Sequence, residues 1–152
     1  MTKACFHRRL DVCEHQLNRC IELFLDSNDF YSSATLAGAA EEVLGKILEA
    51  DSGSKSSSTR RTIALMSSLT PQEIEALKDS AQQKDFPTVR DTFNEYRNWL
   101  KHFKPELDEF FVDAESAAAE LIERAVENFY QVTGRDTPQT ERFLEYQRKL
   151  NS

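Results

Sequence analysis

Glycine and proline are scarce in this chain, with four of each among 152 residues. The glycines stand at positions 38, 45, 53 and 134, too far apart to build a glycine-rich loop around a phosphate group. Because glycine and proline interrupt helices, their few positions predict where helices end. The sequence therefore excludes the common nucleotide-binding loops and leaves room for long helical segments.

Cysteine is also scarce. Three cysteines cannot all pair within one chain, and residues 1–9 carry charge where a secretory signal would be apolar. A chain of this size buries roughly 68–70% of its unfolded surface, so it folds without a disulfide or a metal. We therefore expect a single domain over residues 1–152, located in the reducing cytoplasm, with free cysteines.

Long apolar runs are missing, and acidic residues outnumber basic ones. No run approaches the roughly 18 apolar residues that cross a membrane, so we expect no membrane contact. The chain has 26 acidic and 19 basic residues, which gives a formal net charge of −7 and an isoelectric point near 5.0. This balance excludes a protein whose whole surface attracts nucleic acid, so any phosphate site must be local.

Apolar residues at three- and four-residue spacing predict a helix over 10–24. Capping residues at 27–29 precede a second helix. Its expected buried side carries Leu36, Ala40, Val43, Leu44 and Ile47. Its first half is built from small residues, namely Ala34, Ala37, Gly38, Ala39 and Ala40. Since these leave little side-chain bulk, we expect them to form the central packing seam of a helical bundle.

The rest of the chain is divided by a serine-rich segment and by prolines. Residues 51–61 predict an exposed loop that ends in the basic pair Arg60 and Arg61. Further helices are expected over 63–69, 71–84, 88–104 and 114–132, the last stopped by Gly134. A short C-terminal helix within 135–152 begins at the Thr137-Pro138 pair. No segment predicts a strand, so the fold class is all-α.

The histidines and cysteines raise the question of a metal site. A helical di-iron site requires Glu-x-x-His, and none of the three histidines follows a glutamate at that spacing. Cys5-x-His7 and Cys13-x-His15 with Cys20 offer another cluster. However, Cys13 and Cys20 share the buried face of their helix while His15 points elsewhere, so we interpret the cysteines as core residues and the histidines as solvated. We expect no metal and no other cofactor.

The helix expected over 88–104 carries the residues best suited to chemistry. Its core stripe is predicted to consist of Phe93, Tyr96, Leu100 and Phe103. On the opposite face, Asn98 and His102 lie one turn apart and continue a polar row from Asp91 and Glu95. Arg97, on the flank, is long enough to bring its guanidinium toward the group that His102 would address. A titratable imidazole, an amide and a guanidinium suit phosphodiester chemistry; the alternative is an ordinary solvated face.

A family resemblance favours the functional interpretation. Residues 97–102, R-N-W-L-K-H, resemble the Arg-x(4–6)-His motif of HEPN domains (higher eukaryotes and prokaryotes nucleotide-binding), including the polar residue that often follows the arginine. Residues 29–48, D-F-Y-S-S-A-T-L-A-G-A-A-E-E-V-L-G-K-I-L, resemble the family's small-residue helix, with its acidic residue best matched by Glu41. Residues 117–134, A-A-A-E-L-I-E-R-A-V-E-N-F-Y-Q-V-T-G, resemble its closing helix. The resemblance spans about residues 10–134.

The resemblance implies an up-and-down bundle of four or five helices. It also implies a homodimer in which two Arg/His motifs face each other across a cleft. Active members of the family are metal-independent endoribonucleases, in which the ribose 2′-hydroxyl attacks its own phosphate and leaves a 2′,3′-cyclic phosphate. Carried over to this chain, His102 is the general base or acid, Arg97 the cation on the phosphate and Asn98 a positioning residue. Glu41 and Lys101 are accessory residues, although Glu41 could equally be an exposed acid.

Five further residues are candidates for contact with RNA: Lys55, Trp99, Lys104, Arg60 and Arg61. Trp99 could stack on a base or serve packing alone. Against catalysis, the family has members that bind without cutting, and Asp91 and Glu95 would repel phosphate. Two hypotheses therefore stand. One is a ribonuclease of the toxin or defence kind with an antitoxin-like partner; the other is a non-catalytic module that binds a nucleotide, RNA or a partner protein.

Overall fold

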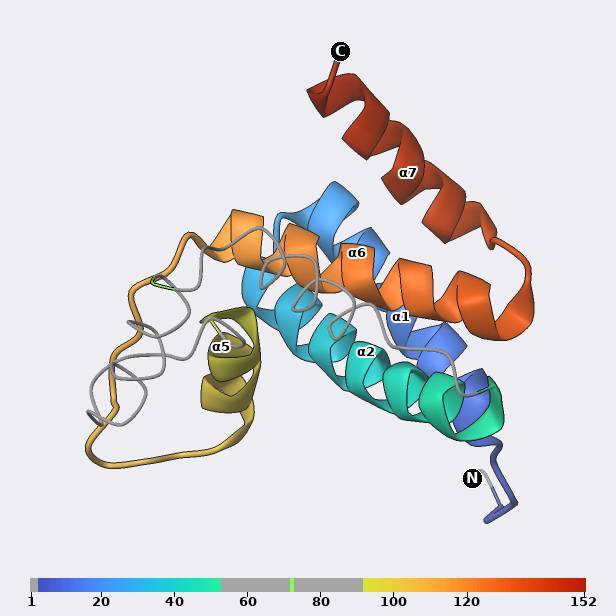
Figure 1. Ribbon diagram of the computed structural model, residues 1–152, viewed down its shortest axis with the longest axis horizontal. Coiled ribbons are helices and arrows are strands. Elements are labelled where there is room, and N and C mark those ends of the chain that lie inside the picture. Colours follow the sequence, from blue (N-terminus) through green and yellow to red (C-terminus); the bar gives the residue numbers. More distant parts are fainter. Residues whose placement is uncertain (1–2, 53–71, 73–91) are drawn as a thin grey trace.

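The computed structural model describes residues 3–52, 72 and 92–152. Within these residues the chain forms helices and no strand, as the all-α prediction requires (Figure 1). The helices are α1 (Arg9–Ser27), α2 (Phe30–Ser52), α5 (Thr92–Lys101), α6 (Ala114–Thr133) and α7 (Pro138–Leu150). None of them is long and apolar enough to cross a membrane.

Several expectations fall outside the described residues. These are the basic residues Lys55, Arg60 and Arg61, the helix expected over 63–69, and the helix expected over 71–84 apart from Gln72. The loop expected over 51–61 lies outside them from residue 53 onward. Its expected start was wrong, because Asp51 and Ser52 still belong to α2.

A tight turn joins α1 to α2 and reverses the chain (Figure 1). Asn28 adopts a left-handed conformation with φ of 51°, and the next backbone N–H, that of Asp29, donates to the carbonyl of Leu23 at 3.0 Å. The Asp29 carboxylate then accepts a hydrogen bond from the backbone N–H of Ser32 at 3.1 Å. The predicted capping residues thus end one helix and begin the next.

Helices α2 and α6 form the packing seam of the molecule. Both helices contribute small, fully buried residues to the core, namely Ala34, Ala37 and Ala40 of α2 and Ala117, Ala118 and Ala125 of α6. The prediction of a small-residue packing seam is confirmed. The expected buried side of α2 was only partly right: Leu36, Val43 and Ile47 are half-buried. The buried face of α2 is centred on these alanines together with Leu44 and Leu48, so Leu36, Val43 and Ile47 lie at its edge.

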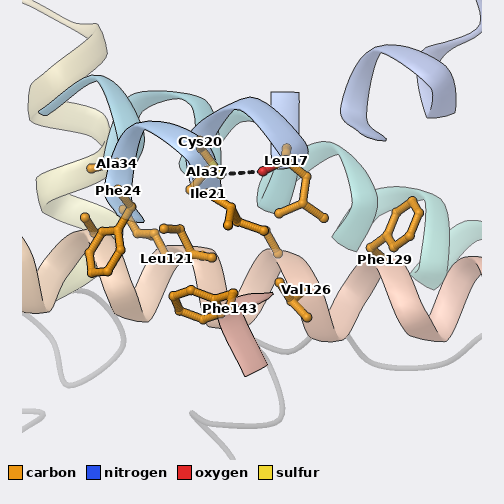
Figure 2. Packing of buried hydrophobic residues seen from close by; sticks show 14 of the residues in the cluster. Leu17, Cys20, Ile21, Phe24, Ala34, Ala37, Leu121, Val126, Phe129 and Phe143 are labelled. Atoms are coloured by element: carbon orange, nitrogen blue, oxygen red, sulfur yellow. Dashed lines mark hydrogen bonds between the residues drawn. The ribbon is translucent and has the colours of Figure 1, made fainter. Parts of the chain in front are cut away.

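Apolar side chains from α1, α6 and α7 fill the space beside this seam. Figure 2 shows Leu17 and Ile21 of α1 with Leu121 of α6 and Phe143 of α7 in one cluster. Edge-on ring contacts dock α7, since the Phe24 centroid lies 6.0 Å from that of Phe143 and 5.4 Å from that of Tyr146. These side chains come from three helices, α1, α6 and α7, so the core is built from segments far apart in sequence.

The cysteine interpretation holds for the two cysteines of α1. Cys13 and Cys20 are both buried, and the Cys20 thiol donates to the carbonyl of Leu17 at 3.0 Å (Figure 2). Burial raises the pKa of the Cys20 thiol above its ordinary value, so this thiol stays protonated. His15 is exposed, as expected.

The predicted ends of the last two helices agree with the structure. Asp113 caps α6 by accepting from the backbone N–H of Ser116 at 2.9 Å, and Gly134, with φ of 70°, ends it. Thr137 and Thr140 exchange hydrogen bonds in a capping box at the start of α7. Helix α6 ends at Thr133, only one residue beyond its expected end at residue 132.

Replacing Leu121 by alanine tests this core. The Leu121 side chain is fully buried, so Leu121→Ala should lower the free energy of unfolding by about 2–5 kcal/mol. Leu150→Ala is the matched control, because this leucine is 66% exposed and the same change should cost less than about 0.5 kcal/mol. Urea unfolding of both variants measures the difference, and equal losses would contradict the core described here.

Candidate functional site

Helix α5 is anchored by its aromatic residues. Tyr96 is buried, and its ring centroid lies 6.3 Å from that of Trp99 and 5.5 Å from that of Phe110. The indole Nε1 of Trp99 donates to the carbonyl of Leu107 at 2.9 Å, which folds the following segment back against the helix. The structure therefore places Trp99 in packing, and its indole N–H is already used. Burial raises the pKa of the Tyr96 hydroxyl.

The C-terminal end of this helix differs from the expectation. Helix α5 ends at Lys101, not Lys104, and its last hydrogen bond runs from the backbone N–H of His102 to the carbonyl of Asn98 at 2.9 Å. Pro105 explains the early end, because a proline ring collides with the carbonyl four residues before it, here that of Lys101. Phe103 consequently leaves the helical period and is 81% exposed, so its assignment to the core stripe was wrong. The Phe93 side chain and the whole of Asp91 lie outside the described residues.

Arg97 pairs with an acidic residue of α2. Its Nη1 lies 2.5 Å from Oε2 of Glu41, and the side chains are 12% and 3% exposed respectively. The Nε atom is buried, lies 4.0 Å from Oε2 of Glu42, and has no hydrogen-bond partner within the described residues. The interpretation of Glu41 as an exposed acid was wrong. The guanidinium is turned to α2, where Glu41 holds it.

Gly38 makes this pairing possible. A Cβ atom built on Gly38 would lie 2.6 Å from Cγ and 2.9 Å from Cδ of Arg97, closer than carbon atoms approach. The missing side chain therefore leaves a channel through which the arginine stem crosses α2. Glu41 stands one helical turn after Gly38, where it receives the guanidinium at the end of that stem.

A second carboxylate extends the network. Glu42 accepts hydrogen bonds from Nζ of Lys101 at 3.0 Å and from Nζ of Lys46 at 3.2 Å. The hydrogen bond from Lys101 is the main cause that lowers the pKa of Glu42 to about 2, with contributions from Lys46 and the charge of Arg97. We refer to Glu41, Glu42, Lys46, Arg97 and Lys101 as the ion cluster. Three cations there face two carboxylates, which leaves a formal charge of +1 on an acidic protein.

The predicted histidine lies outside the ion cluster, at the end of α5. His102 and Asn98 are both exposed, as the polar face of the helix predicted. His102 borders a hollow of about 290 Å³. The other residues that line this hollow are Trp99, Leu100, Lys101, Phe103, Lys104, Leu107 and Asp108. The structure thus brings His102, Lys101 and Lys104 to one place, while Arg97 is held on α2 by Glu41.

Three residues of the site escaped the sequence analysis in their present roles. Gly38 was interpreted only as a small packing residue, and Glu42 and Lys46 were not singled out. A usable signal existed, because Glu42 and Lys46 stand four positions apart on one helix and a glutamate pair directly follows the small-residue stretch. The partner of that pair lies more than fifty residues away, and no local pattern records it.

The cysteines and histidines of the described residues are spread over separate places. Cys5 Sγ lies 3.4 Å from Nε2 of His7, both in the exposed N-terminal segment, whereas Cys13 and Cys20 are buried in α1. In the part of the chain that the structure describes, no group of three or more histidine, cysteine or acidic side chains is placed to hold a metal ion.

No family model, no curated protein and no solved structure matches this chain. The resemblance to HEPN domains therefore rests on residues 97–102 and two helical segments of the sequence alone.

A double-mutant cycle tests the buried pair. Arg97→Met leaves the Glu41 carboxylate buried without its cation and should lower the free energy of unfolding by about 3–5 kcal/mol. Combining Arg97→Met with Glu41→Gln removes both charges, so the double variant should lose less than the sum of the single losses. Urea unfolding measures all three variants. Arg142→Met, which breaks the exposed pair with Asp26, is the control and should change stability little. Additive losses at 41 and 97 would show that the pair is not coupled.

The low pKa of Glu42 makes part of the stability depend on pH. Its pKa falls from an ordinary 4.5 to about 2 in the folded protein, so its ionisation stabilises the fold above about pH 4.5. This contribution is lost as the pH drops toward 2. Lys101→Met removes the hydrogen bond that contributes most to lowering the pKa of Glu42. This pKa should therefore rise toward 4.5, as measured by an NMR titration of the Glu42 carboxyl carbon. The stability difference between wild type and variant should then shrink between pH 4.5 and 2; an unchanged Glu42 titration would refute the assigned contact.

Proposed function

We propose that this chain is a HEPN-like, metal-independent endoribonuclease that cleaves RNA at His102. The observation that carries the proposal is an exposed imidazole at the end of α5, in a hollow that it shares with Lys101 and Lys104. Histidine transfers protons near neutral pH, and lysine ammonium groups attract the phosphate backbone. This combination supplies both requirements of phosphodiester cleavage at one place.

The reaction requires only groups of this kind. The ribose 2′-hydroxyl attacks the adjacent phosphorus, the bond from phosphorus to the 5′-oxygen breaks, and a 2′,3′-cyclic phosphate remains. His102 takes the proton of the 2′-hydroxyl or donates one to the leaving 5′-oxygen. Lys101 and Lys104 offset the negative charge that grows on the phosphate oxygens in the transition state.

In this proposal Arg97 is a phosphate-binding cation, and Glu41 holds its guanidinium in place. Glu41 accepts from Nη1, and no partner of Nη2 is found in the described parts of the chain. A guanidinium carries five N–H donors, so the arginine can keep its contact with Glu41 and still donate to a phosphate oxygen. Asn98, one turn before His102, is the proposed positioning residue.

The assembly is part of the same proposal. A polar face on α5 that turns away from the core is consistent with a second subunit closing over it, as the family resemblance implies. Two copies of the positively charged site would then flank one RNA strand. A toxin of this kind would require an antitoxin-like protein that covers the site.

One observation favours a second candidate function. The guanidinium of Arg97 is already paired with the buried carboxylate of Glu41, and the protein as a whole is acidic. A non-catalytic module that binds a nucleotide, RNA or a protein would use the same residues to hold a dimer or a ligand. This candidate predicts no turnover, together with loss of the dimer or ligand in Arg97→Ala.

An RNA cleavage assay in EDTA distinguishes the two candidates. Wild type should leave 2′,3′-cyclic phosphate ends, and His102→Ala should cleave at least about 100-fold more slowly, because it removes the proton-transfer group. His102 is exposed, so the variant should keep its unfolding free energy within about 0.5 kcal/mol. His15→Ala, an exposed histidine on α1, is the matched control and should cleave normally.

Three outcomes contradict the nuclease assignment. Cleavage that survives in His102→Ala removes the proposed role of the imidazole, and 3′-hydroxyl ends exclude attack by the 2′-hydroxyl. No cleavage of single-stranded or structured RNA by wild type favours the binding module.

A further inference from the structure

An aromatic side chain is exposed beside the proposed proton-transfer group. Phe103 follows His102 directly and is 81% exposed, although Trp99 and Phe110 nearby pack against Tyr96. Single exposed apolar side chains are ordinary, so this ring is informative through its position: it stands in a concave setting beside charged side chains. Phe103 forms part of the wall of the hollow at His102.

The walls of this hollow differ in chemical character. Phe103 and Leu107 are apolar, Lys101 and Lys104 are cationic, and Asp108 is acidic. Lys101 is already held by Glu42, whereas Lys104 has no side-chain partner among the described residues. The volume of about 290 Å³ lies just below the usual range for small-ligand pockets, roughly 300–1,000 Å³. A ligand that fits must therefore be small, with a flat apolar part and an anionic part.

We propose that the hollow binds one unpaired nucleotide of single-stranded RNA, with its base stacked on Phe103 and its phosphate at Lys104. The inference rests on the proposed ribonuclease function, because it names the substrate class of that same site. Asp108 supports this orientation, since its carboxylate repels phosphate but accepts hydrogen bonds from the amino groups of a base.

Stacking of a base on Phe103 favours single-stranded over duplex RNA as the ligand. In a duplex, each base is stacked between its neighbours and cannot lie on a protein ring, whereas an unpaired base can. The Trp99 ring is occupied by stacking on Tyr96 and by its contact with Phe110, whereas the Phe103 ring has no ring partner among the described residues. The stacking role considered for Trp99 in the sequence therefore passes to Phe103.

Binding of an uncleavable probe tests the inference. The probe is a fluorescein-labelled 2′-O-methyl RNA 12-mer, single-stranded or annealed to its complement, which lacks the attacking 2′-hydroxyl. Phe103→Ala should weaken single-strand binding by about 5- to 150-fold and duplex binding by less than about 2-fold, measured by fluorescence anisotropy. Phe103→Tyr should restore it. Phe111→Ala is the matched control, since this phenylalanine is fully exposed but does not line the hollow.

Each outcome supports or overturns the inference. Equal losses on single strand and duplex, no loss in Phe103→Ala, an equal loss in Phe111→Ala, or no binding of the probe by wild type would overturn it. So would a shift from dimer to monomer in Phe103→Ala by light scattering, since Phe103 would then serve a contact between subunits. The probe cannot be cleaved, so selective binding without cleavage of ordinary RNA would reject the nuclease and keep the nucleotide site. Cleavage of ordinary RNA without selective binding of the probe would keep the nuclease and reject the nucleotide site.

Discussion

The packing of α2 against α6, with fully buried alanines on both helices, sets the position of the other helices. Two helices that meet across alanines bring their backbones nearer than leucines would allow, so few rotations of α2 about its axis satisfy the contact. With the alanines turned to the core, the neighbouring face of α2 carries Gly38, Glu41 and Glu42, and α5 meets that face. A packing requirement in the core thus decides which carboxylates the motif helix encounters.

The ion cluster and the hollow have different proposed roles: the cluster positions α5, and the hollow receives a ligand. The Arg97–Glu41 pair of the cluster is buried and, together with the more exposed Lys101–Glu42 pair, binds α5 to α2 through charge, whereas the hollow at His102 is open to solvent. A buried pair of this kind is expensive to form and very sensitive to the loss of one partner, which makes it better suited to fixing an orientation than to adding stability. His102 and Lys104 are both exposed, and Lys104 has no side-chain partner among the described residues.

Local physical rules were enough to predict much of the fold. Asn28, Gly134 and Thr137 end or begin helices through their own backbone and side-chain chemistry, so the sequence places those boundaries to within a few residues. The rotation of α2 was harder, because hydrophobic spacing ranks large side chains above alanine, although alanine permits the closest packing. The end of α5 could have been predicted by counting back four residues from Pro105. The pairing of Arg97 with Glu41 could not, since these residues are 56 positions apart and only the folded structure brings them together.

Gly38 also constrains how this sequence can change over evolutionary time. Because a side chain at 38 would occupy the space of the Arg97 stem, the two positions form one steric unit. A lineage that gains a larger residue at 38 must accept a shorter one at 97 or a displaced helix α5. Substitutions at these two sites should therefore be accepted together or in a fixed order, with the shorter side chain at 97 arising first.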